Sequence, residues 1–93
     1  MIRIMLVEDH TVVREALRGM LEKEPDMQVV AEAGDGESAL RLAREVALEV
    51  VVMDVSMPGL DGIETTRRLL AGNTAIKVLA LSTYRDGRII EQI

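Results

Sequence analysis

Three acidic residues stand at the ends of two apolar runs in this 93-residue chain. Glu8 and Asp9 follow the run at residues 4–7, and Asp54 follows the run at residues 50–53. Carboxylates that are brought together repel one another, and each tends to hold its proton unless a cation relieves the repulsion. Carboxylate oxygens are also the ligands that hard divalent cations prefer. The three acids therefore predict a cation site in which one carboxylate performs chemistry.

The elements that must position these acids alternate along the chain. Short aliphatic runs with many β-branched residues predict strands, and segments with apolar residues at helical spacing predict helices. The expected strands cover residues 2–7, 28–33, 50–55 and 77–81, and the expected helices cover about 12–21, 37–47, 62–72 and from about 86 to the end. Strands and helices that alternate with short connections predict a parallel sheet with helices on its faces.

Capping signals support two of the helix starts. Asp35 stands where it can cap the helix that begins near residue 37. Asp61, followed by Glu64 three residues later, has the pattern of a capping box, and we interpret Asp61 as a cap only. Gly72 is placed to end the third helix.

An open parallel sheet binds ligands beyond the carboxyl ends of its strands, where the strand order reverses. If the order is the flavodoxin-like 2-1-3-4, the reversal falls between the first and third strands. These are the strands that end at Glu8 and Asp9 and at Asp54. Alone, Glu8 and Asp9 are better explained as a solvated strand end. Together with Asp54 at the point of reversal, they favour a metal site.

His10 follows the acidic pair directly. The chain has one histidine and no cysteine. Because no second nitrogen or sulfur ligand is present, we interpret His10 as a surface histidine at a helix start and not as a metal ligand.

The composition excludes several other classes. A formal charge of −5 and a pI near 4.8 argue against direct nucleic-acid binding, which requires a basic face. No apolar run approaches the ~20 residues that cross a bilayer, and residues 1–3 do not resemble a secretory signal. The lack of cysteine fits a reducing compartment. We expect a cytoplasmic protein that does not contact a membrane.

Three motifs together carry a family resemblance over the whole chain. Val-Glu-Asp-His at residues 7–10, Met-Asp-Val-Ser-Met-Pro-Gly-Leu-Asp-Gly at residues 53–62 and Leu-Ala-Leu-Ser at residues 79–82 closely resemble the receiver domain of two-component response regulators. They are most similar to the NarL/FixJ subfamily, whose receivers precede a LuxR-type helix-turn-helix. The resemblance implies an α/β, flavodoxin-like (CheY-like) doubly wound sheet, a sensor histidine kinase as partner and a role in transcription regulation.

The resemblance also implies roles for individual residues. Asp54 would be the phosphoacceptor, and the side chains of Glu8, Asp9 and Asp54, with the backbone carbonyl of Ser56, would hold one Mg²⁺. Ser82 would donate a hydrogen bond to the phosphoryl group and shift on activation. An ordinary strand-end hydroxyl remains an alternative for Ser82.

The family's fifth-strand lysine has no counterpart here, so residues 1–93 are interpreted as an incomplete receiver domain without its fifth strand and fifth helix. The strand at 77–81 would then be an exposed apolar edge, and one sheet face would be covered by the first helix alone. We expect self-association or domain swapping through that edge and the fourth helix. We also expect metal binding to survive better than switching.

Three function classes follow from these observations. The first is a phosphoacceptor switch domain that is not itself an enzyme. The second is a self-associating receiver remnant that acts as a binding or assembly module. The third is a Mg²⁺-dependent phosphatase with an aspartyl-phosphate intermediate, which ranks low because Asp54-Val55-Ser56 lacks the second aspartate of that class's Asp-x-Asp-x-Thr motif.

Overall fold

The computed structural model describes residues 1–54, 62–72, 75–81 and 89–91. Its elements, in chain order, are β1 (Ile2–Val7), α1 (Thr11–Glu22), β2 (Met27–Ala33), α2 (Gly36–Glu45), β3 (Val50–Asp54), α3 (Gly62–Gly72), β4 (Lys77–Leu81) and β5 (Ile89–Glu91). The first four strands are parallel and the sheet order is β2-β1-β3-β4-β5. The predicted flavodoxin-like order 2-1-3-4 is therefore confirmed.

The end of the chain differs from the expected helix. Ile89–Glu91 forms a short strand, β5, that pairs antiparallel with β4, with Leu81 opposite Ile89 and Leu79 opposite Glu91. Residues 86–88 and 92–93 of the expected helix lie outside the described residues. β-Branched residues favour strands, and the open side of β4 offers unpaired backbone groups, so strand pairing outweighs the short helical pattern here. The prediction of an exposed β4 edge is consequently wrong over Leu79–Leu81.

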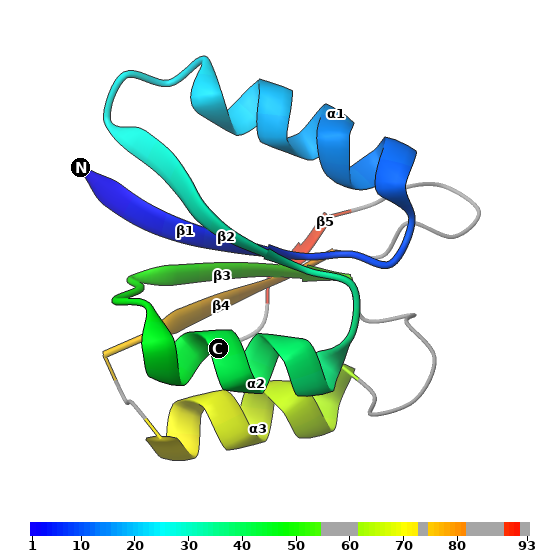
Figure 1. Cartoon of the computed structure of the whole chain (residues 1–93), viewed down its shortest axis with the longest axis vertical. Helices are drawn as coiled ribbons and strands as arrows, with labels where there is room; N and C mark the ends of the chain where they lie inside the picture. The colour runs from blue at the N-terminus through cyan, green and yellow to red at the C-terminus, as the bar shows by residue number, and fades with distance from the viewer. Residues whose placement is uncertain (55–61, 73–74, 82–88, 92–93) are drawn as a thin grey trace.

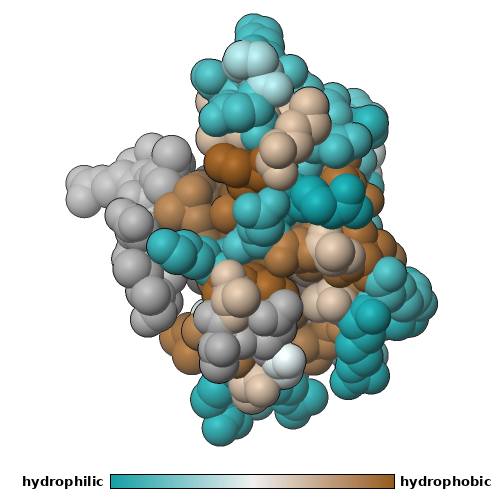
Figure 2. All heavy atoms as spheres, turned by 90° about the vertical axis from the view of Figure 1, so that its left-hand side faces the viewer, coloured by the Kyte–Doolittle hydropathy of each residue, from teal (hydrophilic) through white to brown (hydrophobic). Residues whose placement is uncertain are grey.

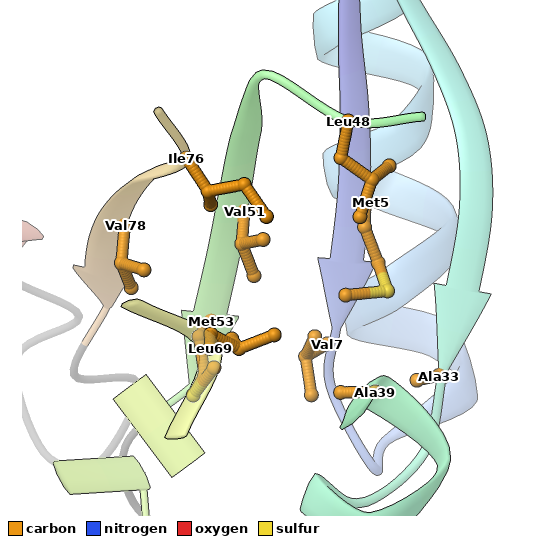
Figure 3. Packing of buried hydrophobic residues seen from close by; sticks show 10 residues of the cluster. All are labelled: Met5, Val7, Ala33, Ala39, Leu48, Val51, Met53, Leu69, Ile76 and Val78. Carbon is orange, nitrogen blue, oxygen red and sulfur yellow. The ribbon is translucent and has the colours of Figure 1, made fainter. Parts of the chain in front are cut away.

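The helices form unequal layers on the two faces of the sheet. Figure 1 shows α1 on one face and both α2 and α3 on the other. Alternate residues of each strand point to opposite faces. The core under α2 and α3 is the larger of the two, and Figure 3 shows its ten buried residues: Met5, Val7, Ala33, Ala39, Leu48, Val51, Met53, Leu69, Ile76 and Val78.

The face under α1 is covered more thinly. Its buried residues come from the sheet and are Ile4, Leu6, Val52 and Leu81. α1 itself has no buried residue, and its Val12 and Met20 side chains are exposed. On the side of the molecule where β1 begins, apolar surface is visible between the polar residues of the two layers (Figure 2). Among the described residues, one sheet face is thus covered by α1 alone, as expected.

The start of α2 has the cap that the sequence predicts. The Asp35 carboxylate accepts a hydrogen bond of 2.7 Å from the Ser38 backbone N–H. This bond satisfies one of the otherwise unpaired N–H groups of the first turn. It also lowers the pKa of Asp35, because it favours the charged carboxylate.

We expect Asp35→Ala to destabilise the domain by about 1 kcal/mol, because the Ser38 N–H loses its acceptor. Asp35→Asn, which can still cap, should cost much less. Since the folded-state pKa of Asp35 is lowered, its charge contributes stability above the unfolded-state pKa and loses that contribution as the pH falls. Urea denaturation of the three proteins at neutral and acidic pH measures both effects. Equal stability of the alanine and asparagine variants would contradict the capping role.

Among the described residues, no helix has the length and apolar character needed to cross a membrane.

Candidate metal centre

The sheet register brings the predicted acids to one edge. β1 and β3 are adjacent and parallel, and Val7 lies opposite Met53. The next residues along these strands, Glu8 and Asp54, therefore lie beside each other where the strands end. Both side chains are 1% exposed. Figure 1 shows that β1 lies between β2 and β3, so this edge is where the order of the strands reverses.

Four potential ligands converge there. Ligand atoms of Glu8, Asp9, His10 and Asp54 all lie within 4.8 Å of one another. The Glu8 Oε1 atom is buried and accepts no hydrogen bond from the described residues. A buried, unpaired carboxylate oxygen is costly unless a cation or donor reaches it. The residues present therefore fit a hard divalent cation such as Mg²⁺, which takes carboxylate oxygens and retains waters.

The electrostatics of the cluster show the cost of gathering these acids. Burial raises the pKa of Glu8, and the charge of Asp54 adds to this effect, while hydrogen bonds from the His10 backbone N–H and imidazole oppose it. The pKa of His10 is raised by its hydrogen bond to Glu8 and by the charges of Asp9 and Glu8. A positive charge is thus favoured at this position, whether it is supplied by an imidazolium or by a metal ion.

His10 is a surface histidine at the start of a helix, as the sequence predicts, and its ring also reaches the acids. Its side chain is 66% exposed, yet its Nδ1 atom lies 2.9 Å from Glu8 Oε2 and 3.1 Å from Asp9 Oδ1. His10 is the N-cap residue of α1 with extended backbone angles, and its side chain makes no capping bond, so the imidazole is available to the acids. The signal in the sequence was the run of three adjacent potential ligands after a buried strand.

Arg14 supports the cluster from the first turns of α1. Its guanidinium donates a 2.8 Å hydrogen bond to the Glu8 backbone carbonyl and a 3.1 Å hydrogen bond to the Glu32 carboxylate on β2. Glu32 also accepts a hydrogen bond from Arg18. From helical spacing alone, Arg14 belongs to the polar side of α1. Arg14 contacts the end of β1 because of the geometry of the connection between β1 and α1. The periodicity of the sequence does not predict that geometry.

We expect Arg14→Ala to lower the free energy of unfolding by about 1–2 kcal/mol, because a charge-assisted bond to a backbone carbonyl is lost beside the site. The matched control is Arg18→Ala, whose more exposed ion pairs should contribute less than about 1 kcal/mol. Urea denaturation compares the two variants. A larger loss in the Arg18 variant would contradict the role given to Arg14.

Three predicted residues cannot be placed. Ser56, Ser82 and Asp61 lie outside the described residues. Leu81, which precedes Ser82 in the sequence, is opposite Asp54 in the β3–β4 pairing.

A separate hollow of about 410 Å³ lies between α2 and α3. It is lined by Leu40, Ala43, Arg44, Arg68, Leu69, Ala71, Gly72 and Ile76. None of the four clustered ligands lines it, so it is distinct from the candidate metal centre.

The fold and the acidic cluster together define a class: a doubly wound α/β domain with buried carboxylates where the strand order reverses. Comparison with known proteins identifies the family. The family model of the response regulator receiver domain matches residues 4–93, and the chain belongs to this family.

Curated relatives are similar over most of the chain. The transcriptional regulatory protein LiaR of Bacillus subtilis is 41% identical over 86 residues, which are 92% of this chain and 41% of LiaR. The response regulator GacA of Pseudomonas viridiflava is 46% identical over 86 residues, which are 92% of this chain and 40% of GacA. The chain therefore spans about two fifths of the length of these relatives.

Solved structures agree with the fold. A two-component response regulator of the LuxR family from Aurantimonas sp. has a TM-score of 0.84 and 44% identity, covering 89% of this chain and 59% of that one. The signal receiver domain of the response regulator NarL from Mycobacterium tuberculosis has a TM-score of 0.83 and 29% identity, covering 91% of this chain and 68% of that one. The CheY-like fold that the sequence predicts is thereby confirmed.

Proposed function

We propose that this chain is a phosphoacceptor domain in which Asp54 accepts a phosphoryl group from a sensor histidine kinase, and that the protein it serves regulates transcription. The observation that carries the proposal is the position of Asp54. It is the last residue of β3, it is 1% exposed, and ligand atoms of Glu8 and Asp9 lie within 4.8 Å. Membership of the receiver family and similarity to LiaR and GacA support it.

The proposed reaction is a phosphoryl transfer to a carboxylate. An oxygen of Asp54 attacks the phosphorus of the donor, and the bond from phosphorus to the donor's nitrogen or oxygen breaks. The donor keeps the electron pair of that bond, and the product is an acyl phosphate on Asp54. The barrier lies mainly in positioning the reactants and neutralising the phosphoryl oxygens.

Each residue of the cluster has a proposed part in this reaction. Glu8 and Asp9 would hold Mg²⁺ together with Asp54 and the carbonyl of Ser56, and the bound ion would neutralise phosphoryl oxygens. Ser82 would donate a hydrogen bond to the phosphoryl group. The pairing of Leu81 with Asp54 supports the part given to Ser82, because it brings the end of β4 level with the acceptor.

Intact-mass spectrometry tests the proposal. The chain is incubated with an acyl phosphate donor in Mg²⁺ or in EDTA, and Asp54→Asn is treated in the same way. We expect one added phosphoryl group in Mg²⁺ and none in EDTA or in the variant. Asp26→Asn, which changes an exposed acid outside the cluster, should still accept the group. Modification that persists in Asp54→Asn would refute the assignment, and steady release of phosphate would instead favour the phosphatase.

Self-association is a second candidate. The observation that favours it is the thin cover over the α1 face, where α1 buries no residue and Val12 is 79% exposed. The β4 edge no longer supports it, because β5 occupies that edge at Leu79–Leu81. Sedimentation velocity over a range of concentrations tests it, and a monomer throughout that range would exclude this candidate.

A further inference from the structure

The imidazole of His10 lies among the proposed Mg²⁺ ligands without being needed for Mg²⁺. Its Nδ1 atom is 2.9 Å from Glu8 Oε2 and 3.1 Å from Asp9 Oδ1. Nδ1 is therefore close enough to both carboxylates for all three groups to bind the same ion. The His10 side chain as a whole is 66% exposed.

These separations are compatible with joint coordination of one ion. Two neighbouring ligand atoms at about 2.1 Å from an octahedral ion are about 3.0 Å apart. Both distances from Nδ1 lie within about 0.1 Å of that value. A metal–imidazole bond of about 2.0–2.1 Å would thus require little movement of the ring.

The buried oxygen of Glu8 independently supports a cation at this position. Glu8 is 1% exposed, and its Oε1 atom has no hydrogen-bond partner in the described part of the chain. The other oxygen, Oε2, accepts the hydrogen bond from the His10 backbone N–H at 2.9 Å. The carboxylate is therefore held in place by its neighbour and still has a free acceptor.

We propose that His10 Nδ1 is a fourth side-chain ligand of this centre and makes it selective for a nitrogen-preferring divalent ion, of the class of Ni²⁺, Co²⁺ and Zn²⁺, over Mg²⁺. Carboxylates and waters suit Mg²⁺, whereas imidazole suits the later transition metals. The inference rests on the proposed function, since both use Glu8, Asp9 and Asp54. A transition-metal ion bound in this way would compete with Mg²⁺ for the same acids.

Isothermal calorimetry with Ni²⁺ and with Mg²⁺ tests the inference on the untagged chain. The titrations are made at a pH of about 8, because metal binding requires the deprotonated imidazole. His10→Asn is a suitable variant, because asparagine is a favourable residue at the N-cap that His10 occupies. We expect His10→Asn to weaken Ni²⁺ binding by at least about tenfold and Mg²⁺ binding by less than about threefold. Asp54→Asn should weaken the binding of both ions.

The spectrum of the imidazole gives a second readout. His10 is the one histidine of the chain, so all imidazole resonances belong to it. Titration with Zn²⁺ should shift the Nδ1 resonance, and titration with Mg²⁺ should leave it nearly unchanged.

The outcomes separate the two proposals. If His10→Asn binds Ni²⁺ as tightly as the wild type while Asp54→Asn does not, the role of His10 is refuted and the acidic centre stands. If the wild type binds neither ion, or Asp54→Asn binds both ions unchanged, the acidic centre itself is refuted.

Discussion

Without divalent ions, Asp54→Asn is expected to be more stable than the wild type, and saturating Mg²⁺ is expected to reverse this order. The metal-free wild type buries Glu8 and Asp54 beside each other, and both are 1% exposed. Burial raises the pKa of Glu8, and the nearby charge of Asp54 adds to this effect. Removing one of the two adjacent buried charges relieves their repulsion and should therefore raise the midpoint of thermal unfolding of the metal-free protein.

Of the wild type and Asp54→Asn, Mg²⁺ should stabilise only the wild type, because the ion binds the intact folded site and not the unfolded chain. At a concentration of about 100 times its Kd, the stabilisation is about 2.7 kcal/mol. Thermal melts of both proteins in EDTA and in a Mg²⁺ series measure at which Mg²⁺ concentration the order of stability reverses. Asp26→Asn is the control: it removes an exposed acid outside the cluster and should respond to Mg²⁺ like the wild type. Equal responses of Asp54→Asn and the wild type would contradict the metal centre.

Met5→Ala should have the largest effect on stability, a loss of about 2–5 kcal/mol. Met5 is 0% exposed and lies on β1 within the core under α2 and α3, where Figure 3 shows it between Leu48 and Val7. Truncating it removes buried apolar atoms and leaves a cavity. A domain of this size has a total stability of only about 5–15 kcal/mol, so the variant should be close to unfolding.

Met20→Ala is the matched control for that prediction. Met20 lies on α1 and is 64% exposed, and alanine is at least as good a helix former as methionine. Its substitution should change the free energy of unfolding by less than about 0.5 kcal/mol. Urea denaturation measures the free energy of unfolding of the two variants. Similar losses of stability in Met5→Ala and Met20→Ala would contradict the assignment of the core.

Much of the fold follows from local pattern in the sequence. The bounds of β1 and β4 agree with the expected runs, and the cap at Asp35 forms as predicted. The juxtaposition of Glu8 and Asp54 was also predictable, because parallel strands carry their carboxyl ends to one edge. These features depend on periodicity and topology, which a sequence displays directly.

Other features depend on geometry that a sequence does not display. The spacing of Ile89 and Ile90 is compatible with a helix, whereas their β-branched side chains favour a strand. The segment forms a strand because it pairs with β4. His10 reaches the Glu8 carboxylate, and Arg14 reaches the Glu8 backbone carbonyl, because of the direction of the chain between β1 and α1. The parts of Ser56 and Ser82 stay predictions, since both lie outside the described residues.

Asp54 is proposed to accept the phosphoryl group in a centre formed with Glu8 and Asp9. The most direct measurement is to phosphorylate the chain in Mg²⁺, reduce the acyl phosphate with borohydride and sequence the peptides by mass spectrometry. Reduction converts a phosphorylated aspartate to homoserine. We expect homoserine in place of Asp54 and at no other position. A modified Asp9, a phosphorylated His10 or an unmodified Asp54 in the phosphorylated protein would contradict this proposal.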